Sequence, residues 1–416
     1  MHSNAMGTDV LVLGAGMVGT CTALQLALRG HSVALVDRRA PGNETSYGNA
    51  GIIQREAVEP YAFPRAWSTV LDVALKRGMD AHYHWRALPS IVSPLARYWH
   101  ASAPSRYASI AHDHRCLIEH CLSEHQVLIA TSGASALVRQ EGYRLAFRSQ
   151  APLDSMAERA LALQAQHGIR HALLDGEALA RAEPGLHKRL AGAVHWLDPW
   201  SVSDPGALVQ RYADRFVALG GHVAEGDAAT LIERAGGWQV QSASGPLNAR
   251  HAVIALGPWA KELTATLGYR LPLFVKRGYH RHYRGGPGLR LPLLDAERGF
   301  VMAPMAQGLR LTTGAEFARL GAPSTPVQLE KVERAARELI GLPEPLETQP
   351  WLGSRPCTVD MKPVIGPAPR HAGLWFNFGH AHQGFTLGPV SGRLMADMIE
   401  NKTPFVDPTP YSPLRF

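Results

Sequence analysis

The sequence has few cysteines and no long apolar run. Its four cysteines, Cys21, Cys116, Cys121 and Cys357, form neither a C-x-x-C motif nor a disulfide framework. This usage predicts a protein of the reducing cytoplasm. No apolar run approaches the roughly 18 residues of a membrane-spanning helix, so no integral membrane segment is expected. No signal peptide precedes the first predicted strand, and residues 1–6 resemble a cloning remnant.

The sequence also lacks a concentration of charge of one sign. Lysine and arginine number 42 against 35 aspartates and glutamates, a net charge of +7, and the basic residues are scattered. This pattern predicts a solvated surface and no nucleic-acid partner. Twenty histidines raise the question of a metal, but no cysteine or carboxylate cluster joins the pairs that have ligand-like spacing. No metal is therefore predicted for His82-x-His84, His112-x-His114 or His280-x-His282.

The chain begins with a pattern typical of dinucleotide binding. An apolar strand over residues 8–13 leads into Gly14-Ala-Gly-Met-Val-Gly19 and a predicted helix over residues 17–29. The three glycines allow a tight turn, close approach of the backbone to a pyrophosphate, and close packing of helix on strand. Free N–H groups at the helix start then face the phosphates. Asp37 ends the second predicted strand, where its carboxylate can accept hydrogen bonds from a ribose.

Length and the recurrence of strands indicate two interleaved domains. At 416 residues, with 46% apolar and 19% charged residues, the chain is an ordinary globular protein larger than one simple core. Parallel-type strands return at residues 252–256 and 373–378. We predict an α/β nucleotide-binding domain from residues 7–55, 150–270 and 350–416. A substrate-binding cap of antiparallel sheet and helices is expected from residues 56–149 and 271–349, with a helix over residues 104–125 above a pocket.

Two further glycine-rich loops favour a flavin over a nicotinamide. Residues 44–52 contain small side chains that let backbone amides approach a ligand, and Thr45 and Ser46 can reach phosphate oxygens. Residues 379–388 form a second glycine loop that runs into a predicted helix. The positive end of that helix can stabilise negative charge on a reduced flavin. A nicotinamide-binding fold does not need this loop.

Together these motifs resemble the D-amino-acid-oxidase superfamily of FAD-dependent oxidoreductases, which includes glycine and sarcosine oxidases. The resemblance extends over residues 9–400. Asp37-Arg38-Arg39, residues 44–51 and the terminal glycine loop are most similar to the small subunit of bacterial D-amino-acid dehydrogenases. Lys276-Arg277-Gly278-Tyr279-His280 is similar to D-hydroxyproline dehydrogenases. The resemblance implies a Rossmann-like FAD-binding domain of the glutathione-reductase type with an inserted substrate domain.

FAD is expected to bind without a covalent bond, because Cys357 does not match the attachment site of sarcosine-oxidase relatives. The residues expected to bind it are Gly14, Gly16, Met17, Val18, Gly19, Asp37, Arg38, Arg39, Thr45, Ser46, Asn49, Ala50, Gly51, Ile52, Ala228, Gly257, Trp259, Gly379, His380, His382, Gln383, Gly384, Phe385 and Thr386.

Arg355 is the first candidate for substrate binding. It precedes Pro356, where relatives such as glycine oxidase hold the substrate carboxylate, and a planar guanidinium binds a carboxylate with two parallel hydrogen bonds. His382 stands in the terminal loop where glycine-oxidase-like relatives have an arginine, so contact with substrate and simple packing both stay open. The same two interpretations apply to Tyr279 and His280, on a strand expected to face the flavin. Tyr61 and His84 are expected to line the cap.

The resemblance implies oxidation of the Cα–N bond of a D-amino acid, with D-proline and cis-4-hydroxy-D-proline among the candidates. The imine product then gives a keto acid and ammonia, or persists as a cyclic pyrroline. A quinone or a partner protein is a candidate electron acceptor, and a quinone would allow peripheral contact at the inner membrane face. The sequence leaves the oligomeric state open. The alternatives are a glycine- or sarcosine-type oxidase, a flavin domain acting on tRNA, and an electron-relay subunit of a heteromeric dehydrogenase.

Overall fold

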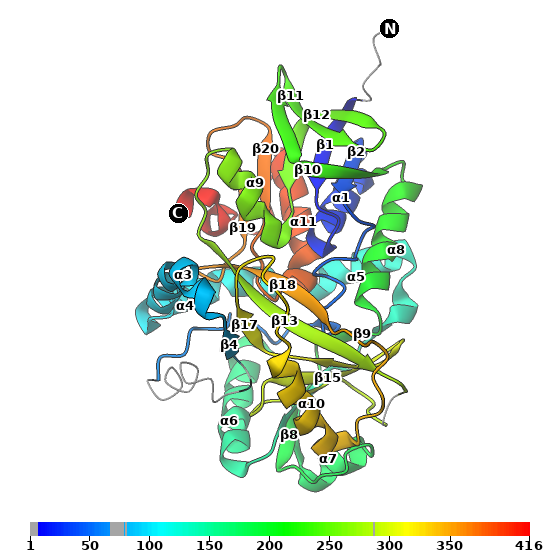
Figure 1. The fold of residues 1–416 in the computed structure, drawn as a ribbon, viewed down its shortest axis with the longest axis vertical. Coiled ribbons are helices and arrows are strands. Elements are labelled where there is room, and N and C mark those ends of the chain that lie inside the picture. Colours follow the sequence, from blue (N-terminus) through cyan, green and yellow to red (C-terminus); the bar gives the residue numbers. More distant parts are fainter. Residues whose placement is uncertain (1–6, 67–78, 80, 286–287) are drawn as a thin grey trace.

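Two large β-sheets, each covered by helices, make up most of the molecule (Figure 1). The computed structural model describes residues 7–66, 79, 81–285 and 288–416. The remnant predicted at residues 1–6 lies outside the described residues. None of the helices in the described part of the chain is long and apolar enough to cross a membrane.

The first sheet has a parallel core in the spatial order β10, β2, β1, β12, β20. β19 pairs antiparallel with β20, and β11 connects β10 to β12 as an antiparallel strand. Strands β1, β2 and β20 are short, mostly apolar runs that are largely buried, as parallel strands covered by helices require. The bounds of the strands in this sheet are β1 (Gly7–Leu13), β2 (Val33–Asp37), β10 (His222–Arg234), β11 (Gly237–Ser242), β12 (Gly245–Ile254), β19 (Val364–Pro367) and β20 (Leu374–Phe378).

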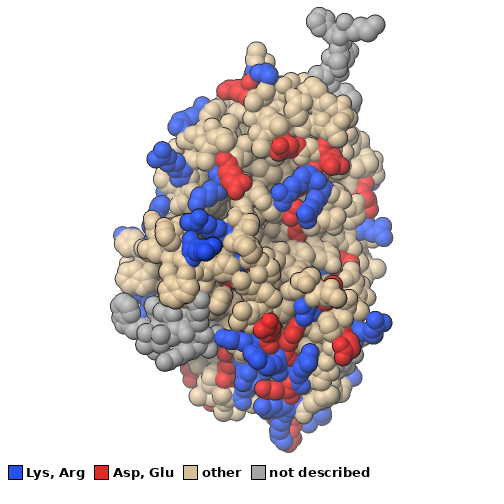
Figure 2. Space-filling view, viewed as in Figure 1, with Lys and Arg blue, Asp and Glu red and all other residues tan. Residues whose placement is uncertain are grey.

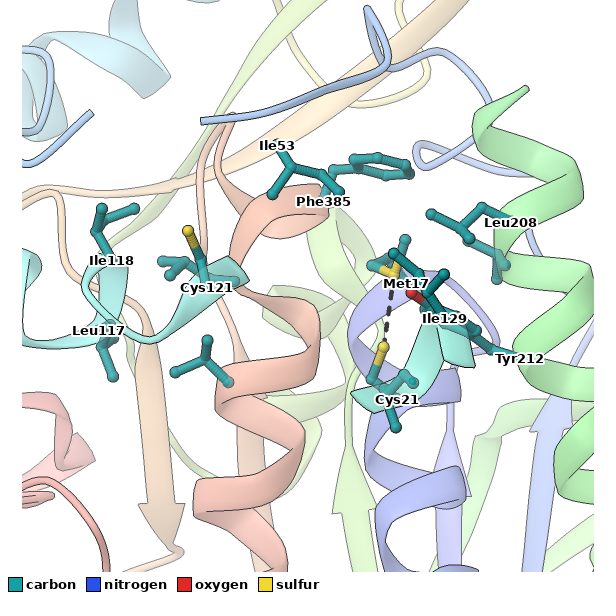
Figure 3. Packing of buried hydrophobic residues seen from close by; sticks show 14 of the residues in the cluster. Met17, Cys21, Ile53, Leu117, Ile118, Cys121, Ile129, Leu208, Tyr212 and Phe385 are labelled. Carbon is teal, nitrogen blue, oxygen red and sulfur yellow. Dashed lines mark hydrogen bonds between the residues drawn. The ribbon is translucent and has the colours of Figure 1, made fainter. Parts of the chain in front are cut away.

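Two helices from opposite ends of the sequence lie side by side on one face of this sheet. They are α1 (Met17–Leu28) and α11 (Gly384–Ile399). A Cβ on Gly392 would lie 2.8 Å from the carbonyl carbon of Cys21, so the glycine allows the two helix backbones to meet. Figure 3 shows the core beside this crossing, where α5 (Cys121–Ser132) and α8 (Pro205–Ala218) add apolar side chains. There Cys21 Sγ lies 3.5 Å from Met17 Sδ.

The second sheet is mainly antiparallel, with parallel pairs only between β4 and β17 and between β14 and β6 among the strands described. Strand β18 pairs with β13 beside the main path. In spatial order the strands are β4 (Ala81–Tyr83), β17 (Ala315–Phe317), β13 (Leu273–Tyr283), β16 (Gly308–Thr312), β15 (Phe300–Met305), β14 (Leu293–Asp295), β6 (Tyr143–Phe147), β8 (Gly192–Trp196) and β7 (His171–Asp175), with β18 (Trp351–Thr358) on β13. A small third sheet joins β3 (Ile52–Ile53), β9 (Trp200–Val202) and β5 (Val138–Arg139).

The strand pairing differs from the predicted domain boundaries in three places. Strands β7, β8 and β18 fall in segments predicted to belong to the nucleotide-binding domain, but all three pair in the second sheet. The difference arises because sheet membership depends on strands that are far apart in the sequence. Strand β8 pairs with β6, and β18 pairs with β13, across tens of residues, and a local apolar pattern does not indicate such pairings. Near its end, β18 reaches the loop that follows β20, where Cys357 forms an isolated antiparallel bridge with His380.

The remaining helices pack at different places (Figure 1): α9 (Ala260–Thr266) packs on the first sheet, α4 (Pro104–Ile118) and α5 pack against α11, and α3 (Leu88–Ala101) lies at a cavity lined by both sheets. The helix predicted over residues 104–125 is two helices, α4 and α5, because a turn at residues 119–120 lets Ile118 and Cys121 both enter the core. The cavity is lined instead by α3. The other helices are α6 (Gln150–His167), α7 (Gly176–Ala182) and α10 (Val327–Ile340).

Candidate active site

A single cavity of about 1160 Å³ extends from the glycine turn after β1 to strands β13 and β18 of the second sheet. This volume exceeds the roughly 300–1,000 Å³ of most small-molecule sites. The walls come from both sheets, from the loop over residues 44–54 and from α3. The cavity therefore has room for a long cofactor and for a second, small molecule.

The glycine turn forms one end of the cavity. Gly14 has φ +106°, and a Cβ there would lie 2.5 Å from the carbonyl oxygen of Ala255 on the neighbouring strand end. A Cβ on Gly19 would collide with the carbonyl oxygen of Gly14, so this glycine allows α1 to pack against the turn, as the motif predicted. The start of α1, with Met17 and Val18, consequently lies at the cavity wall, where an anion is favoured.

Polar groups around this turn are arranged for a nucleotide. The Ala15 N–H donates to Asp37 Oδ2 at 2.6 Å, which holds the carboxylate at the cavity wall. The Met17 N–H donates to Ser46 Oγ at 2.8 Å, which brings a hydroxyl to the start of α1. The Arg38 guanidinium lies 4.3 Å from the centre of the Trp259 ring, and both line the cavity.

Most residues expected to bind FAD line this cavity, although they come from six separate segments. They are Gly14, Gly16, Met17, Val18, Asp37, Arg38, Thr45, Ser46, Asn49, Ala50, Ile52, Ala228, Gly257, Trp259, Gly379, His380, His382, Gly384 and Phe385. Such convergence of distant segments on one wall is what a shared ligand requires.

Five of the expected residues do not line the cavity, and each has a contact elsewhere. Gly19 packs on Gly14, and a Cβ on Gly51 would meet the carbonyl oxygen of Val202. Arg39 is exposed and pairs with Glu44 at 3.4 Å. Both remaining side chains contact Gln54: Gln383 Nε2 donates to Gln54 Oε1 at 3.2 Å, and Thr386 Oγ1 accepts from the Gln54 N–H at 3.2 Å. These five act on the cavity through their neighbours.

Arg355 lies at the other end of the cavity, on β18. Its Nη1 donates to the carbonyl oxygens of Gly314 at 3.1 Å and Arg277 at 3.5 Å. No carboxylate of the described residues forms an ion pair with it. Burial lowers the pKa of this guanidinium below its usual value. A half-buried cation on a cavity wall, without a carboxylate partner, is a site for an anionic ligand group.

Two histidines of the terminal loop line this region and have side-chain nitrogens without a partner. His380 Nε2 and His382 Nε2 are buried without a hydrogen-bond partner, and both residues line the cavity. Burial lowers the pKa of His380 to about 3 and the pKa of His382 well below 6.5, so both rings are neutral. The His382 ring meets the Tyr61 ring edge-on, with centroids 4.4 Å apart. Orphaned buried polar atoms such as these call for a ligand or water.

Tyr279 lines the cavity, as its strand position predicts, whereas His280 and His84 do not. The Tyr279 hydroxyl donates to Glu316 Oε2 at 3.1 Å and accepts from the Thr325 N–H at 2.7 Å, so it is already used within the protein. His280 lies outside the cavity wall and stacks on Trp351, with centroids 4.7 Å apart. Burial lowers its pKa to about 2. His84 Nε2 contacts Glu316 at 3.1 Å in the same buried network.

Sequence analysis missed two residues at this end, Lys276 and Tyr98. Both line the cavity, and Lys276 Nζ donates to Tyr98 Oη at 3.3 Å. The sequence showed Lys276 only as one residue of the segment from Lys276 to His280. It could not show that Lys276 lies opposite Arg355, because that depends on the register of β13 with β18. Tyr98 comes from α3, whose place above the cavity has no local signal in the sequence.

The cavity fits a flavin dinucleotide. The glycine turn, the start of α1 and Asp37 match the needs of the adenosine and pyrophosphate part. The orphaned histidine nitrogens and the start of α11 suit the polar edge of a flavin ring. Fold and cavity together define a two-domain oxidoreductase with a dinucleotide cofactor.

The chain belongs to the DAO family, described as FAD dependent oxidoreductase, whose family model matches residues 9–398. It is 32% identical to a D-amino acid dehydrogenase of Cereibacter sphaeroides, over 96% of this chain and 93% of that protein. It is 29% identical to a D-amino-acid oxidase of Bradyrhizobium diazoefficiens, over 99% of both chains. These findings confirm the predicted family, the FAD-binding Rossmann-like fold and FAD as the cofactor.

Solved structures agree on the fold. Glycine oxidase from Geobacillus kaustophilus has a TM-score of 0.74 at 21% identity, covering 99% of both chains. L-proline dehydrogenase from P. horikoshii also has a TM-score of 0.74, at 16% identity, covering 99% of this chain and 98% of that one.

Proposed function

We propose that this enzyme oxidises the Cα–N bond of a D-amino acid, with FAD bound non-covalently as the hydride acceptor. Arg355 carries the proposal, because its unpaired guanidinium lies in the same cavity as both glycine loops. The names of the relatives from Cereibacter sphaeroides and Bradyrhizobium diazoefficiens, a dehydrogenase and an oxidase of D-amino acids, support it.

In this proposal the protein binds the substrate, orients its Cα and favours the neutral form of its amine. Arg355 holds the α-carboxylate with paired hydrogen bonds and so fixes the position of Cα. The positive charges of Arg355 and Lys276 disfavour a charged ammonium nearby, so the amine is held in its neutral, reactive form. The neutral rings of His380 and His382 add no third charge.

Bound FAD supplies a two-electron acceptor for the hydrogen that leaves Cα as hydride. The amine nitrogen loses a proton as the C=N bond forms. The step therefore balances as an imine, one released proton, and one hydride (a proton with two electrons) that the cofactor would accept. Water then converts a primary imine into a keto acid and ammonia, whereas a cyclic imine stays as a pyrroline. D-Proline and cis-4-hydroxy-D-proline are therefore kept among the candidate substrates.

The test is anaerobic bleaching of the flavin in the purified holoenzyme, with both enantiomers of the amino acids, including the prolines and hydroxyprolines. We expect D-enantiomers to bleach the 450 nm region ~100-fold faster than their L-forms, as a positioned Cα–H requires. Bleaching by no amino acid of either hand would overturn the proposal.

The electron acceptor and location are also proposals. We propose that a quinone or a partner protein reoxidises the flavin, and that the enzyme works in the cytoplasm, with peripheral contact at the inner membrane face. The four free cysteines support a reducing compartment. On the face shown in Figure 2, acidic and basic side chains are interspersed, which supports the proposal that no nucleic acid binds. Comparing reoxidation by oxygen and by a soluble quinone tests the acceptor.

A further inference from the structure

The cavity holds a second unpaired cation, Lys276, on the strand next to Arg355. Strands β13 and β18 pair antiparallel with Lys276 directly opposite Arg355. Residues opposite each other in such a pair project from the same face of the sheet, with Cβ atoms roughly 5 Å apart. Like charges at opposed positions are destabilising. Burial and the charge of Arg355 lower the pKa of Lys276, and a negative charge bound near Lys276 would offset this effect.

The protein does not supply that charge at this end of the cavity. The acidic residues among the described lining are Asp37, Glu44, Asp227 and Glu262, and all four belong to the first sheet or to segments beside it. Glu44 is paired with Arg38 at 2.8 Å. Neither Lys276 nor Arg355 forms an ion pair with a carboxylate in the ranges that the structure describes. The two cations thus face a region without an acid.

The two charged groups point in opposite directions along the strands. Lys276 Nζ lies 4.4 Å from the centre of the Tyr98 ring and 5.7 Å from that of Phe274, two residues back on the same face. Arg355 extends the other way, over Gly278, where a Cβ would lie 2.6 Å from its Nη2. Gly278 is two residues forward of Lys276. Because the two side chains extend in opposite directions, each positive charge can bind a different anionic group.

Lys276 is held in place by aromatic groups. Its ammonium donates to Tyr98 Oη at 3.3 Å, and the Tyr98 hydroxyl in turn donates to the carbonyl oxygen of Tyr61. The Phe317 ring centre lies 5.8 Å away on another side. Rings attract the cation but do not neutralise it, so it keeps capacity for an anionic partner.

We propose that the substrate is an amino acid with a second carboxylate: Arg355 binds the α-carboxylate and Lys276 binds the side-chain carboxylate. The inference rests on the proposed function and narrows its substrate class. A reacting monocarboxylic amino acid with a neutral amine carries one negative charge, which leaves one of the two cations uncompensated. A dicarboxylic amino acid carries two negative charges and so compensates both Arg355 and Lys276. A guanidinium suits the fixed α-carboxylate, and the flexible point charge of a lysine suits side chains of different length.

Pairs of substrates that differ only in charge test this directly. Anaerobic reduction of the holoenzyme is compared for D-glutamate against D-glutamine and for D-aspartate against D-asparagine. We expect kcat/KM to be at least tenfold higher for the acid in at least one pair. A ratio of one or less in both pairs overturns the inference, even when uncharged amino acids reduce the flavin and so support the proposed function.

The variant Lys276→Gln assigns the effect to the residue. We expect the acid-to-amide ratio of kcat/KM to fall at least tenfold, mainly through KM for the acid. An equal loss of kcat/KM for the acid and the amide would mean that both cations bind the same carboxylate. That result would contradict the proposal of two separate anion sites. Glutarate and butyrate provide a measurement without turnover, through the shift that each causes in the flavin absorption spectrum. Glutarate should bind at least tenfold more tightly to the unmodified enzyme, and equal affinities contradict the inference.

Discussion

At the scale of single residues, the proposed carboxylate site at Arg355 is electrostatically unfavourable for the protein itself, because no carboxylate of the described residues pairs with this guanidinium. Its backbone position is opposite that of Lys276 in the pairing of β18 with β13, and its side chain donates hydrogen bonds only to carbonyl oxygens. Arg355→Met should therefore leave the temperature of unfolding unchanged or raise it, because a like-charge opposition disappears. The same change should lower kcat/KM for amino acids by roughly 100-fold or more, since charge-assisted hydrogen bonds contribute about 1.5–3 kcal/mol each. Thermal unfolding and anaerobic kinetics give the two values.

Arg355→Lys is the matched control for that prediction, because it keeps the charge and removes the paired geometry. It should recover a minor part of the lost kcat/KM. Full activity in Arg355→Met would show that the carboxylate is bound elsewhere.

The buried carboxyl group of Glu56 should make the free energy of unfolding of the protein depend on pH. Its Oε1 accepts from Tyr143 Oη at 2.9 Å and from Gln54 Nε2 at 3.0 Å, while Oε2 is buried without a partner. Burial raises the pKa of this carboxyl from 4.5 to about 7. The protonated acid thus contributes stability in full below pH 4.5, and this contribution is lost as the pH rises to about 7. At about 1.4 kcal/mol per pH unit, the loss is on the order of 3 kcal/mol.

Glu56→Gln keeps both acceptor contacts and cannot ionise, so it isolates that contribution. Its free energy of unfolding should exceed that of the unmodified protein increasingly between pH 4.5 and 7, in urea titrations at several pH values. A constant difference across this range would contradict the raised pKa.

At the scale of elements, the crossing of α1 and α11 connects stability to cofactor binding. Gly392→Ala would place a Cβ 2.8 Å from the carbonyl carbon of Cys21 and 2.9 Å from the backbone nitrogen of Thr22, so the helices must separate. We expect a loss of about 1–3 kcal/mol in the free energy of unfolding. FAD affinity should fall as well, because α1 positions the first N–H groups of the cofactor site. Gly7→Ala, with open space at its Cβ, is the control. Equal stability and FAD affinity in the two variants would contradict this.

The elements also show how far the sequence alone could predict the molecule. The turn after β1 and the start of α11 were found because a glycine loop followed by a helix is a local pattern. The domain boundaries differ from the sheet membership of β18 because its partner, β13, is set by non-local pairing. For the same reason, the sequence did not indicate that Lys276 lines the cavity. Its position opposite Arg355, and therefore its relevance to the cavity, depends on register between strands about 80 residues apart in sequence.

At the scale of the whole molecule, one cavity is built from both sheets, so its cofactor should stabilise both. The walls include α1 from the first sheet and β18 from the second, and no single sheet encloses the space. A ligand that binds only the folded state at 100 times its Kd adds about 2.7 kcal/mol to stability. Because α1 and β18 would contact the same FAD molecule, local opening of either one breaks contacts with it.

Hydrogen exchange with and without FAD measures this coupling. Slower exchange is expected at residues 17–20 of α1, at residues 44–54 and at residues 351–358 of β18 when FAD is bound. Strands β7 and β8, which lie outside the cavity wall, serve as the internal reference, because local opening there breaks no contact with the cofactor. Protection confined to α1 and its neighbours in the first sheet would mean that the second sheet contacts only the substrate. Protection of β18 to the same degree as α1 shows that the strand carrying Arg355 is ordered by the cofactor before any substrate binds.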